Sequence, residues 1–149
     1  MLNILNFLKS IEKLNYAICK LDVPYMPKNF PIEYQIGKDI DILTSERDFE
    51  KMKRRIKEYG YKYKNKFKIK EIEQKKRYKL RFIHNNKLHY QIDCEINNGL
   101  IKNRIEMFKD NLKYYSTSFE NERKIRLLEV KKYPKKKHHR EWLNKYNIN

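Results

Sequence analysis

The chain has 149 residues, of which 40% are hydrophobic and 37% charged, and 36 Lys and Arg against 19 Asp and Glu give a formal net charge of +17. This length fits one domain, the short apolar runs exclude a membrane-spanning helix, and two cysteines without a Cys/His cluster exclude a disulfide framework. We therefore expect a single-domain cytoplasmic protein with no membrane partner. The positive charge favours RNA, tRNA or other polyanions as partners, although a lysine-rich composition alone produces the same excess.

The first part of the chain combines short elements with one long loop. Apolar residues at helical spacing predict an amphipathic helix over 2–14, and residues 16–21 predict a short strand. Three prolines within 22–37 predict a loop. Loops of this length inside small domains are usually functional or mobile, so we expect this segment to take part in function, together with the basic segment near the C-terminus.

A strand, a helix and a second strand are predicted next. Strict alternation in KDIDIL predicts a strand over 38–43. Ser45 and Asp48 resemble a capping box at the start of a helix, and Gly60 is a natural residue to follow its end. Aromatic and apolar residues that alternate with lysines predict another strand over 61–69.

Residues 77–84 and 88–96 are predicted to form a hairpin, because Asn-Asn between them is a typical turn signal. A two-residue loop places Leu80 opposite Gln91 and mixes apolar with polar side chains. A three-residue loop over 85–87 makes both faces consistent, so we prefer that register. Its polar face then holds three pairs: Arg77 with Glu95, Lys79 with Asp93, and Arg81 with Gln91.

The remainder of the chain is predicted to be helical. An apolar stripe over 101–112 predicts one helix, and a second stripe predicts another that Pro134 ends. A last helix follows the basic run 135–140, to which we assign His138 and His139 without a role in a site.

Together these elements predict an α+β fold, a small mixed or antiparallel sheet flanked by helices. We expect one domain over 1–149, with a core over 1–98 and a helical, basic C-terminal extension over 99–149.

Three aspartates carry the functional prediction. Asp39 and Asp41 share one face of their predicted strand, although aspartate is disfavoured in strands. Such a pair can converge on two metal ions spaced ~3.5–4 Å apart, and Mg²⁺ prefers these oxygen ligands together with substrate phosphates. Asp93 lies mid-strand beside Lys79 and Arg81 in the preferred register. The alternative is a solvated strand face with a cross-strand salt bridge between Lys79 and Asp93.

These pieces resemble the DNA polymerase β-like nucleotidyltransferase superfamily. They are GKDIDIL, the helix ending in EYGY, and the hairpin that carries Asp93, and DIDILTSERDFEKMKRRIKEYGY is especially similar to the minimal single-domain members. The resemblance covers 2–96 in element order. It implies a small mixed sheet flanked by helices, two Mg²⁺ ions, a nucleoside triphosphate such as ATP as substrate, and in-line attack on its α-phosphate with release of pyrophosphate. The Gly-Ser or Gly-Gly turn typical of the family is missing, because residues 19–24 contain no glycine.

The resemblance also implies roles for individual residues. Asp39 and Asp41 bind both metals, and Asp93 holds the catalytic metal and accepts the proton of the acceptor hydroxyl. Backbone amides near a glycine can approach phosphate closely, and cations offset its charge. The residues expected at the phosphates are Gly37, Lys38, Lys20, Lys79 and Arg81.

Three functions remain open at this stage. The first is an enzyme that transfers a nucleoside monophosphate to a small molecule, an RNA or a protein. The second is a catalytically degenerate nucleotide- or RNA-binding module, which the missing glycine turn favours. The third is a nucleotidyltransferase-type toxin acting on tRNA, which the net charge of +17 suits.

Overall fold

The computed structural model describes residues 4–21 and 39–146, and all statements below concern these ranges. The predicted loop over 22–37 lies outside them. The elements are α1 (Leu5–Ser10), β1 (Tyr16–Cys19), β2 (Asp39–Thr44), α2 (Phe49–Tyr61), β3 (Lys68–Glu73), β4 (Arg77–His84), β5 (Lys87–Ile96), β6 (Ile105–Lys109), β7 (Leu112–Ser116), α3 (Phe119–Lys132) and α4 (Lys137–Lys145).

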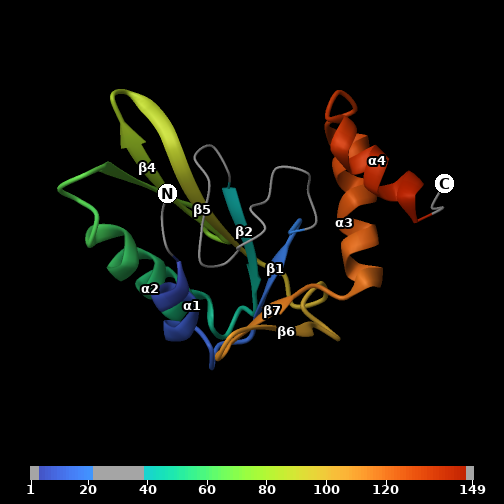
Figure 1. Cartoon of the computed structure of the whole chain (residues 1–149), viewed down its shortest axis with the longest axis horizontal. Helices are drawn as coiled ribbons and strands as arrows, with labels where there is room; N and C mark the ends of the chain where they lie inside the picture. Colours follow the sequence, from blue (N-terminus) through green and yellow to red (C-terminus); the bar gives the residue numbers. More distant parts are fainter. Residues whose placement is uncertain (1–3, 22–38, 147–149) are drawn as a thin grey trace.

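The strands form one mixed sheet in the order β3-β4-β5-β2-β1-β7-β6. The pairs β2–β5 and β1–β7 are parallel, and the other neighbours are antiparallel. Figure 1 shows α1 and α2 on one side of the sheet and α3 and α4 on the other. The predicted α+β class, a mixed sheet flanked by helices, is confirmed. None of the helices in the described ranges is long and apolar enough to cross a membrane.

The two faces of the sheet bury different amounts of apolar surface. The main core lies between the sheet and the helices α1 and α2, and it includes Ile40 and Ile42 of β2. A smaller cluster on the other face brings Cys19 and Leu43 together with Ile125 of α3. Because side chains alternate along a strand, Asp39 and Asp41 lie on the α3 face, where the smaller cluster leaves room for polar groups.

The β4–β5 hairpin has the predicted register but a different turn. Lys79 is opposite Asp93, as expected. Asn85 and Asn86 both adopt left-handed φ angles, 50° and 60°, in a two-residue turn, and a register shift follows between Phe82 and Ile83. A β-bulge accommodates one extra residue in one strand, so it restores the register that a three-residue loop was expected to provide.

Three segment predictions are wrong in type or extent. Residues 101–112 do not form a helix, because β6 and β7 make a hairpin there that joins the sheet beside β1. The C-terminal helices therefore begin at Phe119 rather than near 99. Residues 61–67 end α2 and turn, so the strand β3 begins only at Lys68. The N-terminal helix is confined to α1 within the expected 2–14.

Two local features of α2 differ from the sequence prediction: the turn that precedes it and the position of Gly60. The Ser45 hydroxyl accepts a hydrogen bond from the Asp48 amide at 3.2 Å, but this bond lies in the turn before the helix: the N-cap of α2 is Asp48, whose side chain makes no capping hydrogen bond, so the expected capping box is not formed. Gly60 lies inside the helix instead of following it. A Cβ atom built on Gly60 would collide with the buried side chain of Leu80 on β4, so the missing side chain lets α2 lie close to the sheet.

Replacing Gly60 by Ala is therefore expected to destabilise the fold. The gain in helix propensity of about 1 kcal/mol is outweighed by overpacking against Leu80, and we expect a net loss of about 1–2 kcal/mol. The midpoint of urea unfolding measures the change. Gly99→Ala is the control, because the nearest atom to its added Cβ lies 3.7 Å away. An equal or higher midpoint for Gly60→Ala than for the wild type would contradict the packing argument.

Candidate active site

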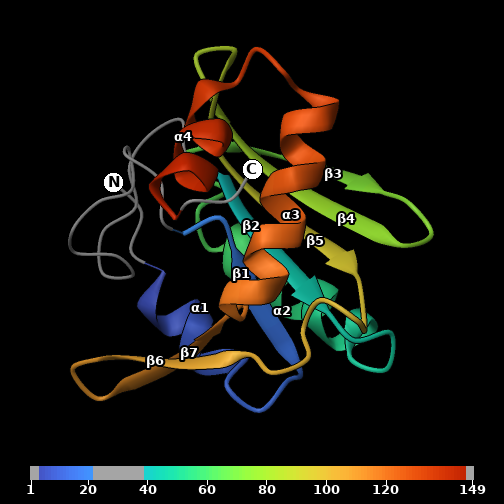
Figure 2. The same cartoon turned by 90° about the vertical axis from the view of Figure 1, so that its right-hand side faces the viewer.

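Asp41 and Asp93 lie side by side at the centre of the sheet. They are cross-strand partners on the parallel strands β2 and β5, which are about 4.8 Å apart as neighbouring strands. Both line a pocket of about 170 Å³ between the sheet and α3, and Figure 2 looks onto α3 in front of this part of the sheet. Asp39 lies two residues earlier on the same face, opposite Gln91, and does not line the pocket.

Each of the two central carboxylates contacts cations of the chain. The Lys20 ammonium lies 3.2 Å from Oδ2 of Asp41. The Arg77 Nε donates to Oδ1 of Asp93 at 3.2 Å, and the Lys79 Nζ lies 3.9 Å from Oδ2 of Asp93. The predicted neighbours Lys20 and Lys79 are therefore at the carboxylates, and Arg77 is closer to Asp93 than Lys79 is.

Of the remaining predicted phosphate contacts, only Arg81 lies within the described residues. Arg81 donates to the side-chain oxygen of Gln91 at 2.9 Å and does not line the pocket, because two residues along β4 carry it away from Asp93. Gly37 and Lys38 lie outside the described residues.

Burial and neighbouring charges act in opposite directions in the pocket. Burial raises the pKa of Asp93, the nearby Asp41 carboxylate raises it further, and Arg77 and Lys79 lower it. Burial lowers the pKa of Lys20, but Asp41 and Glu129 outweigh that effect, so its pKa is raised overall. Lys20 is therefore a charged ammonium at neutral pH.

Lys20 has an unusual backbone conformation for its residue type. Its φ angle is 58°, in the left-handed region that glycine adopts without steric cost. Its amide donates to Oε1 of Glu122 at 3.0 Å, which holds the conformation. This position follows directly after β1, where the family resemblance leads one to expect a glycine turn. The chain therefore reaches a glycine-like conformation there with a cationic residue.

Buried polar groups of α3 and α4 support this arrangement. Arg126 is fully buried, and its Nε donates to Oε1 of Glu122 at 2.9 Å. Thr117 donates to Oε2 of the same carboxylate at 2.6 Å. Arg126 also contacts Nδ1 of His139 at 3.2 Å. A guanidinium only donates hydrogen bonds, so Nδ1 of His139 accepts and its Nε2 carries the proton.

The same network reaches the candidate site through Glu129. The Nε2 of His139 faces Oε2 of Glu129 at 3.6 Å, and Oε1 of Glu129 lies 3.5 Å from the Lys20 ammonium. Lys20 is thus held between Asp41 on the sheet and Glu129 on α3.

Sequence reasoning missed most of these supporting residues. The sequence places His139 in a basic run with no role in a site, yet the residue is 2% exposed. Glu122 and Arg126 have the i, i+4 spacing of a helical ion pair, which is the available signal, but the apolar stripe predicted for this helix does not match its buried face, because Leu128 is 63% exposed. Residues missed at the site are Arg77, Glu122, Arg126, Glu129 and His139.

Asp39, Asp41 and Asp93 are the three carboxylates predicted to bind metal ions. Within residues 4–21 and 39–146, no group of three or more His, Cys, Asp and Glu side chains is arranged to hold a metal ion. Asp41 and Asp93 nevertheless fit Mg²⁺, which binds one or two carboxylates and completes its shell with substrate phosphates and water. The donor chemistry is therefore suitable for a metal that arrives with a nucleotide.

Comparisons of the chain with protein-family models, curated proteins and solved structures find no match. The functional interpretation therefore depends on the geometry of this pocket and on the sequence resemblance.

Removing the buried guanidinium is expected to destabilise the protein strongly. Arg126→Met leaves the Glu122 carboxylate buried without its cation, at a cost of about 3–5 kcal/mol. Chemical denaturation measures the loss. The double variant Arg126→Met/Glu122→Gln removes the unpaired charge and is expected to recover part of it. A loss below about 1 kcal/mol in the single variant would mean that the pair is not buried as the structure has it.

The stability of the protein is expected to depend on pH through His139. Burial lowers its pKa to about 3, and four cationic neighbours act in the same direction: His138, Arg126, Lys20 and Lys136. The unfolded chain binds a proton at this residue below about pH 6.5 and the folded chain does not. Stability from this group is therefore complete above pH 6.5 and falls with decreasing pH, by up to about 1.4 kcal/mol per pH unit, until pH approaches 3.

Denaturation at pH 6.5, 5.5 and 4.5 measures this dependence. His139→Gln keeps an acceptor for Arg126 and a donor for Glu129 but does not titrate, so its stability is expected to fall less steeply than that of the wild type. His84→Gln, at an exposed histidine, is the control and is expected to keep the wild-type slope. Parallel curves for the wild type and His139→Gln would contradict a neutral, buried His139.

Proposed function

We propose that this chain is a Mg²⁺-dependent nucleotidyltransferase, which transfers a nucleoside monophosphate from a nucleoside triphosphate to an acceptor hydroxyl and releases pyrophosphate. The observation that carries the proposal is the pairing of Asp41 with Asp93 on neighbouring parallel strands, inside a pocket that also holds Lys20 and Arg77. Carboxylates of this kind hold Mg²⁺ together with substrate phosphates, and cations stabilise the negative charge of the reacting phosphates.

Each residue of the pocket has a separate role in the proposed reaction. Asp41 and Asp93 would hold the metal, with Asp39 on the same face of β2. The bound metal supplies Lewis-acid stabilisation to the attacking and leaving oxygens. Lys20 and Arg77 offer their charge to the triphosphate, and the resemblance gives Asp93 the additional role of accepting the proton of the acceptor hydroxyl.

A second candidate is a protein of the same fold that binds nucleotide without transferring it. The observation in its favour is that Asp41 and Asp93 are each paired with a cation of the chain itself. Carboxylates neutralised in this way compete less strongly for Mg²⁺, because the metal must displace Lys20 and Arg77. A toxin acting on tRNA uses the same chemistry as the first candidate and differs from it only in the acceptor.

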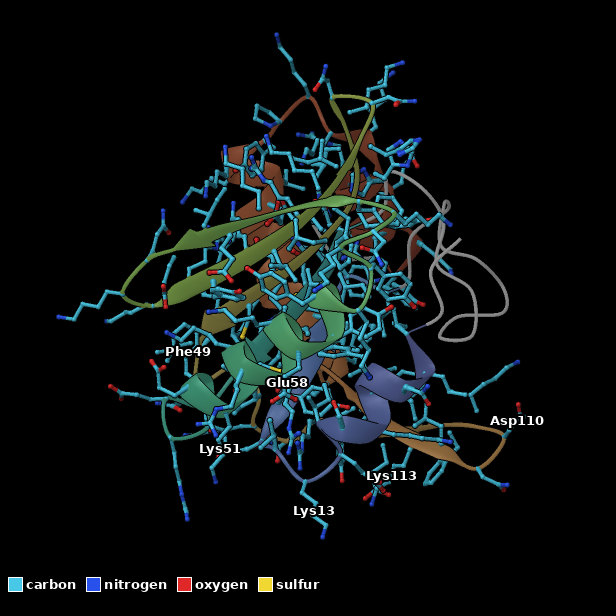
Figure 3. The ribbon with its side chains drawn as sticks, turned by 90° about the vertical axis from the view of Figure 1, so that its left-hand side faces the viewer. Lys13, Phe49, Lys51, Glu58, Asp110 and Lys113 are labelled. Carbon is cyan, nitrogen blue, oxygen red and sulfur yellow. The ribbon has the colours of Figure 1, made fainter. Side chains whose placement is uncertain are left out.

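Loss of either central carboxylate is expected to abolish transfer. The purified protein is incubated with Mg²⁺ and each α-labelled nucleoside triphosphate, and the acceptors are a small-molecule extract, total tRNA and total protein. We expect label in one acceptor fraction, reduced by at least about 100-fold in Asp41→Asn and Asp93→Asn. Asp110→Asn is the matched control, because Asp110 is exposed at the β6–β7 turn (Figure 3) and does not line the pocket.

Three outcomes decide between the candidates. Label that disappears in both pocket variants and persists in Asp110→Asn supports the transferase, and the labelled fraction identifies the acceptor. Label that persists in both pocket variants contradicts the assignment of Asp41 and Asp93. No label in any fraction, together with a nucleotide-dependent rise in the wild-type melting temperature, supports binding without transfer.

A further inference from the structure

A second hollow lies between α1 and α2, on the opposite face of the sheet from Asp41 and Asp93. It encloses about 440 Å³, and we call it the basic groove. Its cations come from both helices and the turn after α1, and all are exposed; they are Lys9, Lys13, Lys51, Arg54 and Arg55. Two acidic residues, Glu12 and Glu58, also line it. Figure 3 looks onto this face and shows Lys13, Lys51 and Glu58 on it.

The two flanks of α2 differ in whether their cations form ion pairs. On the flank toward β3, Lys53 pairs with Glu73 at 2.8 Å, and Lys57 pairs with Glu71 at 3.3 Å. On the flank toward α1, Arg55 pairs with Glu58 at 3.3 Å, whereas Lys51 and Arg54 form no ion pair with any described residue.

The lysines on the opposite wall of the groove are also unpaired among the described residues. Lys9 and Lys13 also form no ion pair within residues 4–21 and 39–146. A lysine-rich composition explains many surface cations, but it does not explain why, within the part of the chain that the structure describes, Lys53 and Lys57 on the β3 flank of α2 are paired while Lys51 and Arg54 on the α1 flank are not. The groove therefore concentrates positive charge that the protein itself does not neutralise.

From this arrangement we infer that the basic groove binds the phosphodiester backbone of a nucleic acid. Lys51 and Arg54 are three residues apart, about 4.5 Å along the axis of α2, and Lys9 and Lys13 line the groove from α1 and the turn after it. The charges are thus spread along a groove instead of meeting at one point, which suits a chain of phosphates better than a single anion. The lining contains one apolar residue, Leu14, too little for a helix pair that inserts into a membrane surface.

This inference is independent of the proposed transferase activity. The groove shares no lining residue with the pocket of Asp41 and Asp93, and the sheet separates the two. A nucleic acid bound in the groove would be a binding partner, and it need not be the acceptor of the proposed transfer reaction.

The test measures binding of labelled oligonucleotides of about 20 nucleotides by fluorescence anisotropy, with the full chain, between 50 and 200 mM salt. The groove variant is Lys51→Gln/Arg54→Gln. The matched control, Lys124→Gln/Lys131→Gln, removes the same charge from exposed positions of α3. We expect the groove variant to bind at least about 10-fold more weakly, with a salt slope reduced by about two, and the control to change less than about 3-fold.

RNA and DNA of the same sequence, single-stranded and duplex, are compared to identify the source of the backbone. Preference for one of them, or equal binding, supports the inference provided that the groove variant loses affinity selectively. Equal losses of affinity in the groove variant and the control would overturn the inference, because binding would then depend on net charge alone. The absence of binding at 50 mM salt would also overturn it. If Lys51→Gln/Arg54→Gln fails to fold by circular dichroism, Lys9→Gln/Lys13→Gln tests the same groove from its other wall.

Discussion

The parallel pairing of β2 with β5 places Asp41 beside Asp93 at the centre of the sheet. Two carboxylates on neighbouring strands repel each other, and burial raises the pKa of Asp93. Two cations offset this repulsion: Lys20, which follows β1, pairs with Asp41, and Arg77 on β4 pairs with Asp93. The chain retains an arrangement that costs free energy to fold, which is a common property of sites that carry out chemistry.

The position of Lys20 links the sheet to the C-terminal helices. Its left-handed backbone is held by Glu122, and its ammonium is shared between Asp41 and Glu129. Glu122 is in turn paired with Arg126 and hydrogen-bonded by Thr117. Residues 119–145, which lie within the predicted C-terminal extension over 99–149, therefore supply the contacts that orient a residue of the candidate site.

The sequence predicts the local parts of this site well, because alternation along a strand is a local property. It correctly places Asp41 and Asp93 on polar faces, and the β4–β5 register sets Lys79 opposite Asp93. It fails at 101–112, where apolar residues at helical spacing belong to a hairpin whose pairing with β1 is a long-range contact. Burial of His139 and Arg126 depends on how α3 and α4 pack together, which neither residue type nor spacing reveals.

The contacts of Lys20 with α3 also constrain the order in which parts of the protein fold. Its contacts with Glu122 and Glu129 span 102 and 109 positions of the chain. Contacts between residues so far apart form late, because the intervening chain must first be ordered. During synthesis β1, β2 and β5 leave the ribosome before α3. The strands that carry Asp41 and Asp93 are therefore synthesised before Glu129, and the electrostatic balance of the pocket is complete only after α3 has been made.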